Sequence, residues 1–469
     1  MAAYRWRRGL EAVCGLAALA LAQGADAAAL KFGGPLPASE LHEVRTLGSL
    51  IRRAEATSAI GAPDRVVHVM FVHGIRADRR GTSDSFRAGL CAKFPELCPG
   101  RKGQPRPAGS IRLLIGDMPH ANVLGVELWN DAAAWRDSEP FVDRYVYRQG
   151  DKVRVIVDEV NWWPLIFPLK CRMLVLPEAQ LSGADREHLQ LCAGNADHKA
   201  PADYAYHRWL TDAELGAALQ PAISGGGAWG NRLLKQQLMN WGLSDAVVSL
   251  GPMRVYLRRA IGEAFNAAER AEGLSPAQQD FVLASESLGS FIVMDALEYA
   301  DQPPTLMEAA EQDRVQALSR VMHRTADIYF FANQFPLLEL ARVHKLPPSP
   351  DNNQAPPAAG GATPAPVVSV GALSAWARPQ ISKAPREGMP IALQIVAFSD
   401  PSDVLTYYVP QIPHAPDGPV VRVVNLYDSN AFNWFGLLED PGAAHTGHTR
   451  NPAVLEALFG QDWTRVRLP

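Results

Sequence analysis

The sequence of 469 residues lacks the features that mark several classes of protein. It has no long basic run, and its 45 Lys and Arg residues nearly balance 49 Asp and Glu residues, so the formal net charge is only −4. Since nucleic-acid binders carry strongly basic surfaces, we expect no nucleic-acid partner. At 47% hydrophobic and 20% charged residues, the chain is too apolar to be disordered. No internal repeat is visible, and the length allows one large domain or two to three small ones.

The N-terminal segment is apolar over only a short stretch. Three arginines precede an apolar run at residues 13–22, and Ala25-Asp26-Ala27 provides a small-x-small cleavage site. This is the three-part layout of a secretory signal peptide, and the run is too short to span a bilayer comfortably. We therefore expect residues 1–27 to direct export to the periplasm or the medium. Retention of the segment as a membrane anchor is the alternative.

Cysteine is scarce, with five residues in the chain. Cys14 lies in the predicted signal peptide, and no lipobox-like cysteine follows, which disfavours a lipid anchor. The other four are Cys91, Cys98, Cys171 and Cys192. An even number in an oxidising compartment predicts two disulfides, most simply Cys91–Cys98 and Cys171–Cys192, with the other pairings left open. Three histidines near Cys192 suggest zinc as a rival, but the spacings match no common zinc pattern, and we expect no metal.

Strand-like and helix-like segments alternate along much of the chain. Strand-like runs, most of them largely apolar, occur at residues 66–72, 153–160, 281–284, 328–332, 391–398 and 420–427. Helical patterns occur at residues 85–93, from Pro252 onward, at 290–297 and at 452–459. This alternation predicts an α/β fold with a mostly parallel central sheet and helices on both faces.

Two segments interrupt the alternation. Residues 164–251 are longer than one crossover helix requires, and we expect an inserted cap over the site. Aromatic and apolar residues just before this segment and within it could form the core of the cap, line an apolar acyl pocket or lie against lipid; they are Trp162, Trp163, Ile166, Phe167, Trp229 and Trp241. Residues 346–367 are rich in Pro, Ala and Gly without periodicity, which predicts a flexible surface loop. We expect residues 28–469 to form a single α/β domain that carries both insertions.

A pentapeptide directly after the strand at 281–284 has the pattern of a site for a nucleophilic serine. Ser285-Glu286-Ser287-Leu288-Gly289 is an S-x-S-x-G version of the G-x-S-x-G nucleophile elbow, a sharp turn between a strand and a helix. The turn needs small residues two before and two after the nucleophile, and Ser285 and Gly289 meet that need. Ser287 would present its hydroxyl near the N-terminus of the next helix, whose field favours an anion.

The motif and the residues behind it resemble the α/β-hydrolase superfamily, whose members place serine, acid and histidine in that order along the chain. After Ser287 come Asp403, behind the strand at 391–398, and His445, behind the last strand. The acid turn of the family is similar to the sequence from Asp400 to Pro410, although Asp400 replaces its glycine and the Val-Pro pair comes later. The resemblance implies a triad of Ser287, Asp403 and His445. Asp400 remains the alternative acid, and His448 the alternative base.

The strand at 66–72 ends at His73-Gly74 and resembles the oxyanion-hole strand of the same family. The resemblance implies that an amide at Gly74 or Ile75 points at the developing oxyanion. The second amide would come from Leu288, the residue after the nucleophile. We expect His73 to be a structural neighbour of this loop rather than the base.

The resemblance therefore implies a serine hydrolase, lipase-like or esterase-like, that cleaves carboxylic esters through an acyl-enzyme, with polyester, thioester and amide substrates left open. The N-terminal segment adds the expectation that the enzyme is exported. The resemblance implies no cofactor and no metal. A small or lipid-like ester is the expected substrate, and the cap could touch a membrane peripherally. The alternative function is a cell-envelope binding protein that keeps the hydrolase scaffold without its chemistry.

Overall fold

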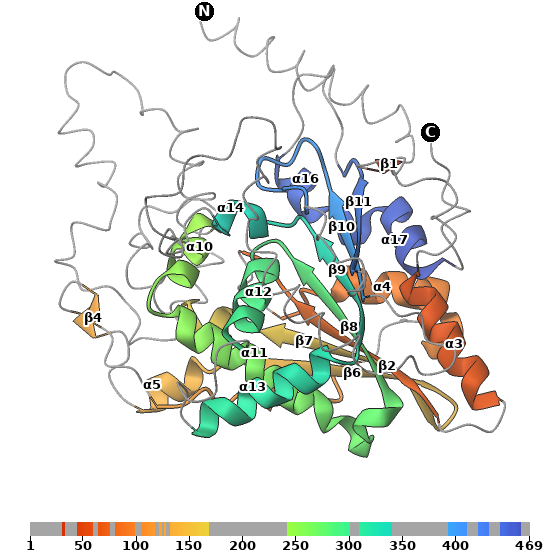
Figure 1. The fold of residues 1–469 in the computed structure, drawn as a ribbon, viewed down its shortest axis with the longest axis horizontal. Coiled ribbons are helices and arrows are strands. Elements are labelled where there is room, and N and C mark those ends of the chain that lie inside the picture. Colours follow the sequence, from red (N-terminus) through yellow and green to blue (C-terminus); the bar gives the residue numbers. More distant parts are fainter. Residues whose placement is uncertain are drawn as a thin grey trace, which may run out of the picture.

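The computed structural model describes residues 31–32, 45–59, 64–75, 80–98, 106–117, 122–123, 126–127, 132–167, 242–300, 309–339, 393–409, 421–430 and 441–460. They build a nine-stranded sheet in the order β1-β11-β10-β9-β8-β2-β7-β6-β3 (Figure 1). Its strands are β1 Lys31–Phe32, β2 Val66–Val72, β3 Gly109–Arg112, β6 Phe141–Gln149, β7 Lys152–Asn161, β8 Gln279–Glu286, β9 Thr325–Phe331, β10 Leu393–Ser399 and β11 Val421–Tyr427. A separate short hairpin joins β4 Asn122–Val123 to β5 Val126–Glu127.

The middle of the sheet is parallel. Strands β11, β10, β9, β8, β2 and β7 each run parallel to their neighbours in this order. The edges are antiparallel, with β1 against β11, β6 against β7 and β3 against β6. Every residue of β2 and β10 is buried, as expected for parallel strands covered on both faces. The described residues thus confirm the predicted α/β class and its mostly parallel sheet.

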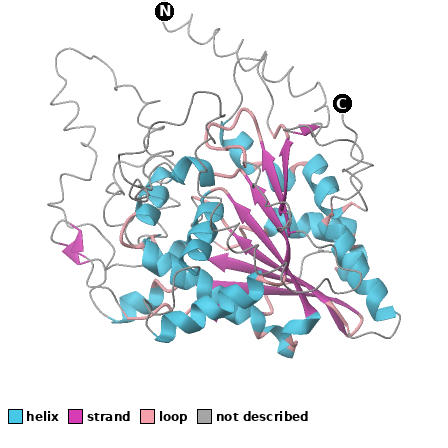
Figure 2. Ribbon diagram, viewed as in Figure 1, coloured by secondary structure: helices cyan, strands magenta, loops and turns pink. Residues whose placement is uncertain are grey.

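Helices cover both faces of the sheet (Figure 2). One face packs on α11 Arg254–Glu269, α12 Leu288–Ala300 and α13 Ala309–Met322, and the other on α3 Leu47–Ala59, α4 Asp84–Lys93 and α17 Pro452–Phe459. Shorter helices are α5 Ala132–Asp137, α10 Ser244–Leu250, α14 Phe335–Glu339 and α16 Pro441–Thr446. In α11 the buried side chains recur at helical spacing and face the sheet, which explains why this segment is a helix. The strands of the sheet lie between the two cores.

Most of the predicted segments are present, some with extended bounds. The strand predicted at 66–72 and the helix predicted at 452–459 have the bounds of β2 and α17. The strand predicted at 281–284 is longer, because β8 runs from Gln279 to Glu286. The helix behind it begins at Leu288, directly after the proposed nucleophile, rather than at Ser290. The helix α3 and the antiparallel strands β3 and β6 were not predicted.

Strand β6 was not predicted, because it buries charged residues where a buried strand is expected to be apolar. Asp143 is fully buried, and Arg144 is 7% exposed. The Arg144 guanidinium donates to both oxygens of Asp158 on β7, at 2.7 and 2.6 Å, and the same carboxylate lies 3.0 Å from Nε2 of His68 on β2. The pKa of Asp158 is lowered: burial alone would raise it, but His68 and Arg144 outweigh that effect. Buried charges are tolerated when they are paired in this way.

One predicted disulfide is confirmed. Cys91 in α4 is bonded to Cys98, just after the turn η1 Pro95–Leu97. Cys171 and Cys192 lie outside the described residues, as do the proposed signal peptide and the loop at 346–367. Most of the proposed cap, residues 168–241, also lies outside them. Within the described part of the chain, no helix is both long enough and apolar enough to span a membrane.

Two of the large side chains at the start of the proposed cap belong to the main core. Trp162, Ile166 and Phe167 are buried, and the first two pack with the sheet and with α11 and α12 in one cluster. Trp163, in the turn η2 Trp163–Leu165, makes edge contacts with Phe141 and Phe167. Trp229 and Trp241 lie outside the described residues.

Candidate active site

Ser287 occupies a strained turn between β8 and α12. Its φ is +53°, in the left-handed region that residues with a side chain seldom adopt. The turn is fixed by backbone hydrogen bonds on both sides. The Ser287 amide donates to the Phe331 carbonyl at 2.7 Å, and the Ser290 hydroxyl donates to the Ser287 carbonyl at 2.7 Å. This is the conformation that the elbow motif predicted, with the side chain presented at the carboxyl end of a parallel strand.

Two glycines are required by close approach at this turn. A Cβ at Gly74 would lie 2.4 Å from the Ser287 Cβ. A Cβ at Gly289 would lie 2.4 Å from the Val72 carbonyl oxygen and 2.6 Å from that of His73. Because real Cβ contacts are never that short, the elbow can pack against the end of β2 only with glycine at both positions. The need for a small residue two places after Ser287 is therefore explained by contact with β2.

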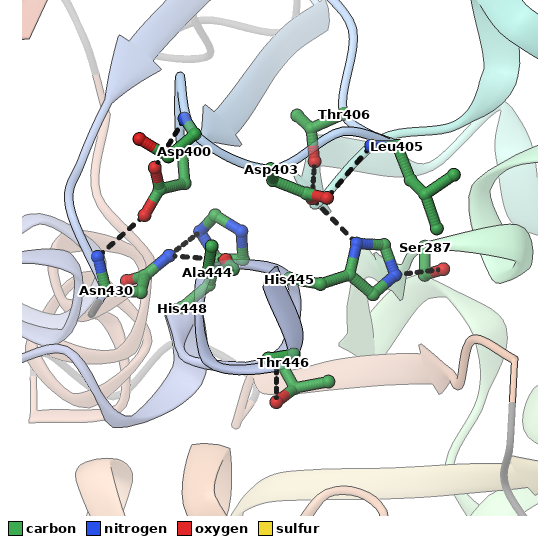
Figure 3. Close-up of polar contacts among 12 residues, drawn as sticks. Ser287, Asp400, Asp403, Leu405, Thr406, Asn430, Ala444, His445, Thr446 and His448 are labelled. Carbon is green, nitrogen blue, oxygen red and sulfur yellow. Dashed lines mark hydrogen bonds and ion pairs between the residues drawn. The ribbon is translucent and has the colours of Figure 1, made fainter. Parts of the chain in front are cut away.

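The structure brings Ser287, His445 and Asp403 together in one hydrogen-bonded chain (Figure 3). His445 Nε2 lies 2.7 Å from Ser287 Oγ, and His445 Nδ1 lies 2.6 Å from Asp403 Oδ2. His445 sits near the end of α16, and Asp403 lies in the loop after β10. All three side chains are buried, with Ser287 at 2%, Asp403 at 5% and His445 at 7% exposure. Side chains separated by 116 and 42 residues in the sequence thus meet at one edge of the sheet.

The carboxylate of Asp403 is held in its charged form. Its Oδ1 accepts from the Leu405 amide at 2.9 Å, and its Oδ2 accepts from the Thr406 hydroxyl as well as from His445. Burial alone would raise the pKa of Asp403, but the hydrogen bonds from His445, Thr406 and Leu405 outweigh it and leave the pKa below its usual value. An ionised carboxylate only accepts hydrogen bonds, so the proton of the His445 ring is assigned to Nδ1. The lone pair of Nε2 then faces the Ser287 hydroxyl.

The alternative acid and base lie close by but make other contacts. Asp400 accepts from the Ser402 amide at 2.9 Å and from the Asn430 amide at 2.7 Å. His448, fully buried, bonds through Nδ1 to Asp428 Oδ2 at 2.8 Å. Neither side chain has a hydrogen bond to Ser287 in the described structure. The structure therefore joins the first-choice acid and base to Ser287.

Sequence reasoning missed the partner of His448. Asp428 follows β11 directly, just as Asp400 follows β10, and β10 and β11 are parallel neighbours. The carboxyl ends of neighbouring parallel strands lie side by side, so a charged residue directly after each strand could have predicted that Asp428 lies near this site. Burial alone would lower the pKa of His448, but Asp428 raises it above its usual value, with Glu286 and Asp403 adding to that effect. Burial in turn raises the pKa of Glu286, against opposing effects of His445, His448 and Arg450.

The residues proposed for the oxyanion hole lie beside Ser287. Gly74 follows β2, which pairs directly with β8, and Leu288 is the first residue of α12. An amide in the first turn of a helix has no acceptor within the helix and is free to bind an oxyanion. His73 Nδ1 donates to the Gly74 carbonyl at 2.8 Å, and since the peptide is planar and trans, the Ile75 amide points the opposite way.

His73 is buried as a structural neighbour of this loop. Its ring stacks on Trp162 with 4.5 Å between centroids, and Trp162 Nε1 donates to the His73 carbonyl at 2.9 Å. These contacts fix the backbone that carries Gly74. Among the described residues, no group of three or more His, Cys, Asp and Glu side chains could hold a metal ion. The histidines near Cys192 lie outside that part of the chain.

Comparison with known proteins adds no relative. No protein-family model matches the chain, and neither a curated protein nor a solved structure matches it. The function is therefore inferred from the geometry of the site.

Proposed function

We propose that this protein is a serine hydrolase that cleaves carboxylic esters. The observation that carries the proposal is the chain from Asp403 through His445 to Ser287, with bonds of 2.6 and 2.7 Å and with the serine in a left-handed turn between a strand and a helix. A nucleophile, a base and an orienting acid in such contact are the signature of an activated serine.

We propose further that the fold is of the α/β-hydrolase type. In support, the elbow lies between β8 and α12, and the strand that ends at Gly74 is the direct neighbour of β8. The acid follows β10, and the histidine follows β11, so serine, acid and histidine come in that order along the chain. Groups on this scaffold converge at the carboxyl ends of the parallel strands.

The proposed mechanism is acyl transfer to water. Ser287 Oγ attacks the ester carbonyl while its proton passes to His445 Nε2, and Asp403 stabilises the imidazolium that forms. Amides at Leu288 and at Gly74 or Ile75 hold the oxyanion of the tetrahedral intermediate. The imidazolium then protonates the leaving alcohol. Water attacks the acyl-enzyme in a second cycle with His445 again as base, and releases the acid and the free serine.

An apolar ester is the substrate class that we propose. Three apolar or aromatic side chains are exposed within five residues of the acid: Val404 at 67%, Tyr407 at 39% and Tyr408 at 42%. Exposed large apolar side chains in the loop that carries a reactive group are typical of contact with apolar ligands. We also propose export by the N-terminal segment, which N-terminal sequencing of the protein recovered from its cells would test.

The function is tested by labelling the purified protein with a fluorophosphonate probe and mapping the modified residue. We expect modification at Ser287 that is lost in Ser287→Ala and strongly slowed in His445→Ala. The matched control is Ser285→Ala, which removes a buried hydroxyl two residues away and should leave labelling intact. Folded wild-type protein that neither labels nor hydrolyses any p-nitrophenyl ester in a series of acyl lengths would refute the proposal and favour a binding protein on this scaffold.

A further inference from the structure

Asn430 contacts the backbone next to the proposed base. It lies in the loop after β11, and its side-chain Nδ2 donates to the Ala444 carbonyl at 3.0 Å (Figure 3). Ala444 immediately precedes His445 in α16. That helix has only six residues, and helices this short are not stable by themselves. The direction in which His445 points must therefore be fixed by contacts from outside the helix.

Asn430 is itself tied to the loop of the proposed acid. Its backbone amide donates to Asp400 Oδ2 at 2.7 Å. Asp400 Oδ1 accepts from the Ser402 amide, and the Asp400 carbonyl accepts from the Asp403 amide at 3.0 Å. Asp400 therefore shapes the turn that carries Asp403 and anchors Asn430 to it. One path of hydrogen bonds thus joins the acid loop to the helix of the base without passing through the triad.

The side-chain oxygen of Asn430 is also held by a hydrogen bond. The Asn451 side chain, which caps α17, donates to Asn430 Oδ1 at 3.0 Å and to the Ser429 carbonyl at 3.1 Å. Asn430 Nδ2 lies 3.1 Å from His448 Nδ1, but this nitrogen donates its proton to the Asp428 carboxylate. His448 Nδ1 therefore cannot accept a hydrogen bond from Asn430. The Asn430 amide is therefore left to donate to the Ala444 carbonyl. The orientation of the amide follows from its neighbours.

Gly447 shows how closely the two segments pack. A Cβ there would lie 2.5 Å from the Asn430 Cβ and 2.6 Å from the Ala443 carbonyl oxygen. Gly447 has a φ of −79°, which any residue can adopt, so glycine is needed here for close approach and not for its backbone freedom. A side chain at this position would push the helix of His445 away from Asn430.

We propose that Asn430 is a positioning residue for His445, and that with Asp400 it sets the distance between the loop of Asp403 and the helix of the base. This inference rests on the proposed hydrolase function. A displacement of about 1 Å in a catalytic group can cost about 100-fold in rate. Residues that hold the base therefore belong to the site although they never touch substrate.

The test is Asn430→Asp, which keeps the shape of the side chain but leaves no amide to donate to the Ala444 carbonyl. We expect kcat for a p-nitrophenyl ester to fall by about 100-fold with KM unchanged, and the rate of fluorophosphonate labelling to fall in parallel. The matched control is Gln394→Glu, because the Gln394 amide donates to the Arg45 carbonyl at 2.8 Å at the opposite end of β10. That variant should keep the wild-type kcat.

A second variant separates the two segments without changing Asn430. Gly447→Ala should lower kcat to a similar extent, and the double variant with Asn430→Asp should lose little more, because both break the same contact. The thermal unfolding of every variant is measured beside its kinetics. If either Asn430→Asp or Gly447→Ala does not fold, the other variant carries the test. The inference is overturned if folded Asn430→Asp or folded Gly447→Ala keeps its kcat. It is also overturned if the Gln394→Glu control loses as much kcat as Asn430→Asp for the same loss of thermal stability, because the effect on kcat would then come from stability alone.

The two proposals fail in different ways. Wild-type protein without labelling at Ser287 refutes the hydrolase function, and the role of Asn430 falls with it. Wild-type protein that labels at Ser287, with unchanged kcat in Asn430→Asp, refutes only the positioning role.

Discussion

Replacing Asp403 by Asn tests the assignment of the acid, because the side chain keeps its shape and loses only its charge and one acceptor. The carboxylate accepts from His445, from the Leu405 amide and from Thr406. An Asn side chain has one oxygen, and if that oxygen serves the Leu405 amide, its NH₂ faces His445 Nδ1. The ring must then carry its proton on Nε2, where it cannot accept the proton of Ser287.

The magnitude follows from losing both the correct tautomer and the negative charge beside the imidazolium. The corresponding change in a serine protease triad costs about 10⁴-fold in kcat, which is about 5.4 kcal/mol of activation free energy. We expect a loss of this order for Asp403→Asn, measured with a p-nitrophenyl ester and by the rate of fluorophosphonate labelling. Asp400→Asn should cost far less, since Asp400 bonds to Asn430 and Ser402 and not to His445.

The assignment of Asp403 as the acid would be wrong if folded Asp403→Asn kept more than a tenth of the wild-type kcat. It would also be wrong if Asp400→Asn were the more damaging of the two. Circular dichroism and thermal unfolding establish that each variant is folded. The Leu405 amide retains an acceptor in Asp403→Asn, so we expect the loop to persist.

Three further predictions concern stability and the elbow. Burial raises the pKa of Asp327 to about 6. Between about pH 4 and pH 6 the folded protein therefore keeps a proton on this carboxyl that the unfolded chain has lost. The free energy of unfolding should fall by on the order of 3 kcal/mol as the pH rises through this range. Asp327→Asn should remove that slope from denaturant melts, and a persistent slope would place it elsewhere. Gly74→Ala puts a Cβ 2.4 Å from the Ser287 Cβ and should slow labelling at least about 100-fold; normal labelling would mean that β2 moves aside. Replacing Cys91 and Cys98 by Ser opens a loop with a sequence separation of 7 and should lower the free energy of unfolding by about 2.5 kcal/mol, with labelling unchanged; coincident melts would contradict this.

Features with a local physical cause could be predicted from the sequence. Strand β2 is mostly apolar because both of its faces are covered, and α17 begins with a proline directly after an Asn cap. The elbow was predictable for a similar reason, since the close contact with β2 demands small residues at fixed positions around Ser287. Strand β6 could not be predicted, because Asp143 and Arg144 are buried only by virtue of partners on other elements.

The sequence by itself determined the α/β class, the turn at Ser287 and the two short segments that hold the proposed acid and base. It left Asp400 beside Asp403 and His448 beside His445, because each pair is three residues apart in one segment. Only the tertiary structure decided between them. Hydrogen bonds depend on direction and on distances of a few ångströms, which arise when the ends of β8, β10 and β11 come together. The same convergence placed Asn430 against Ala444, a contact with no trace in any local pattern.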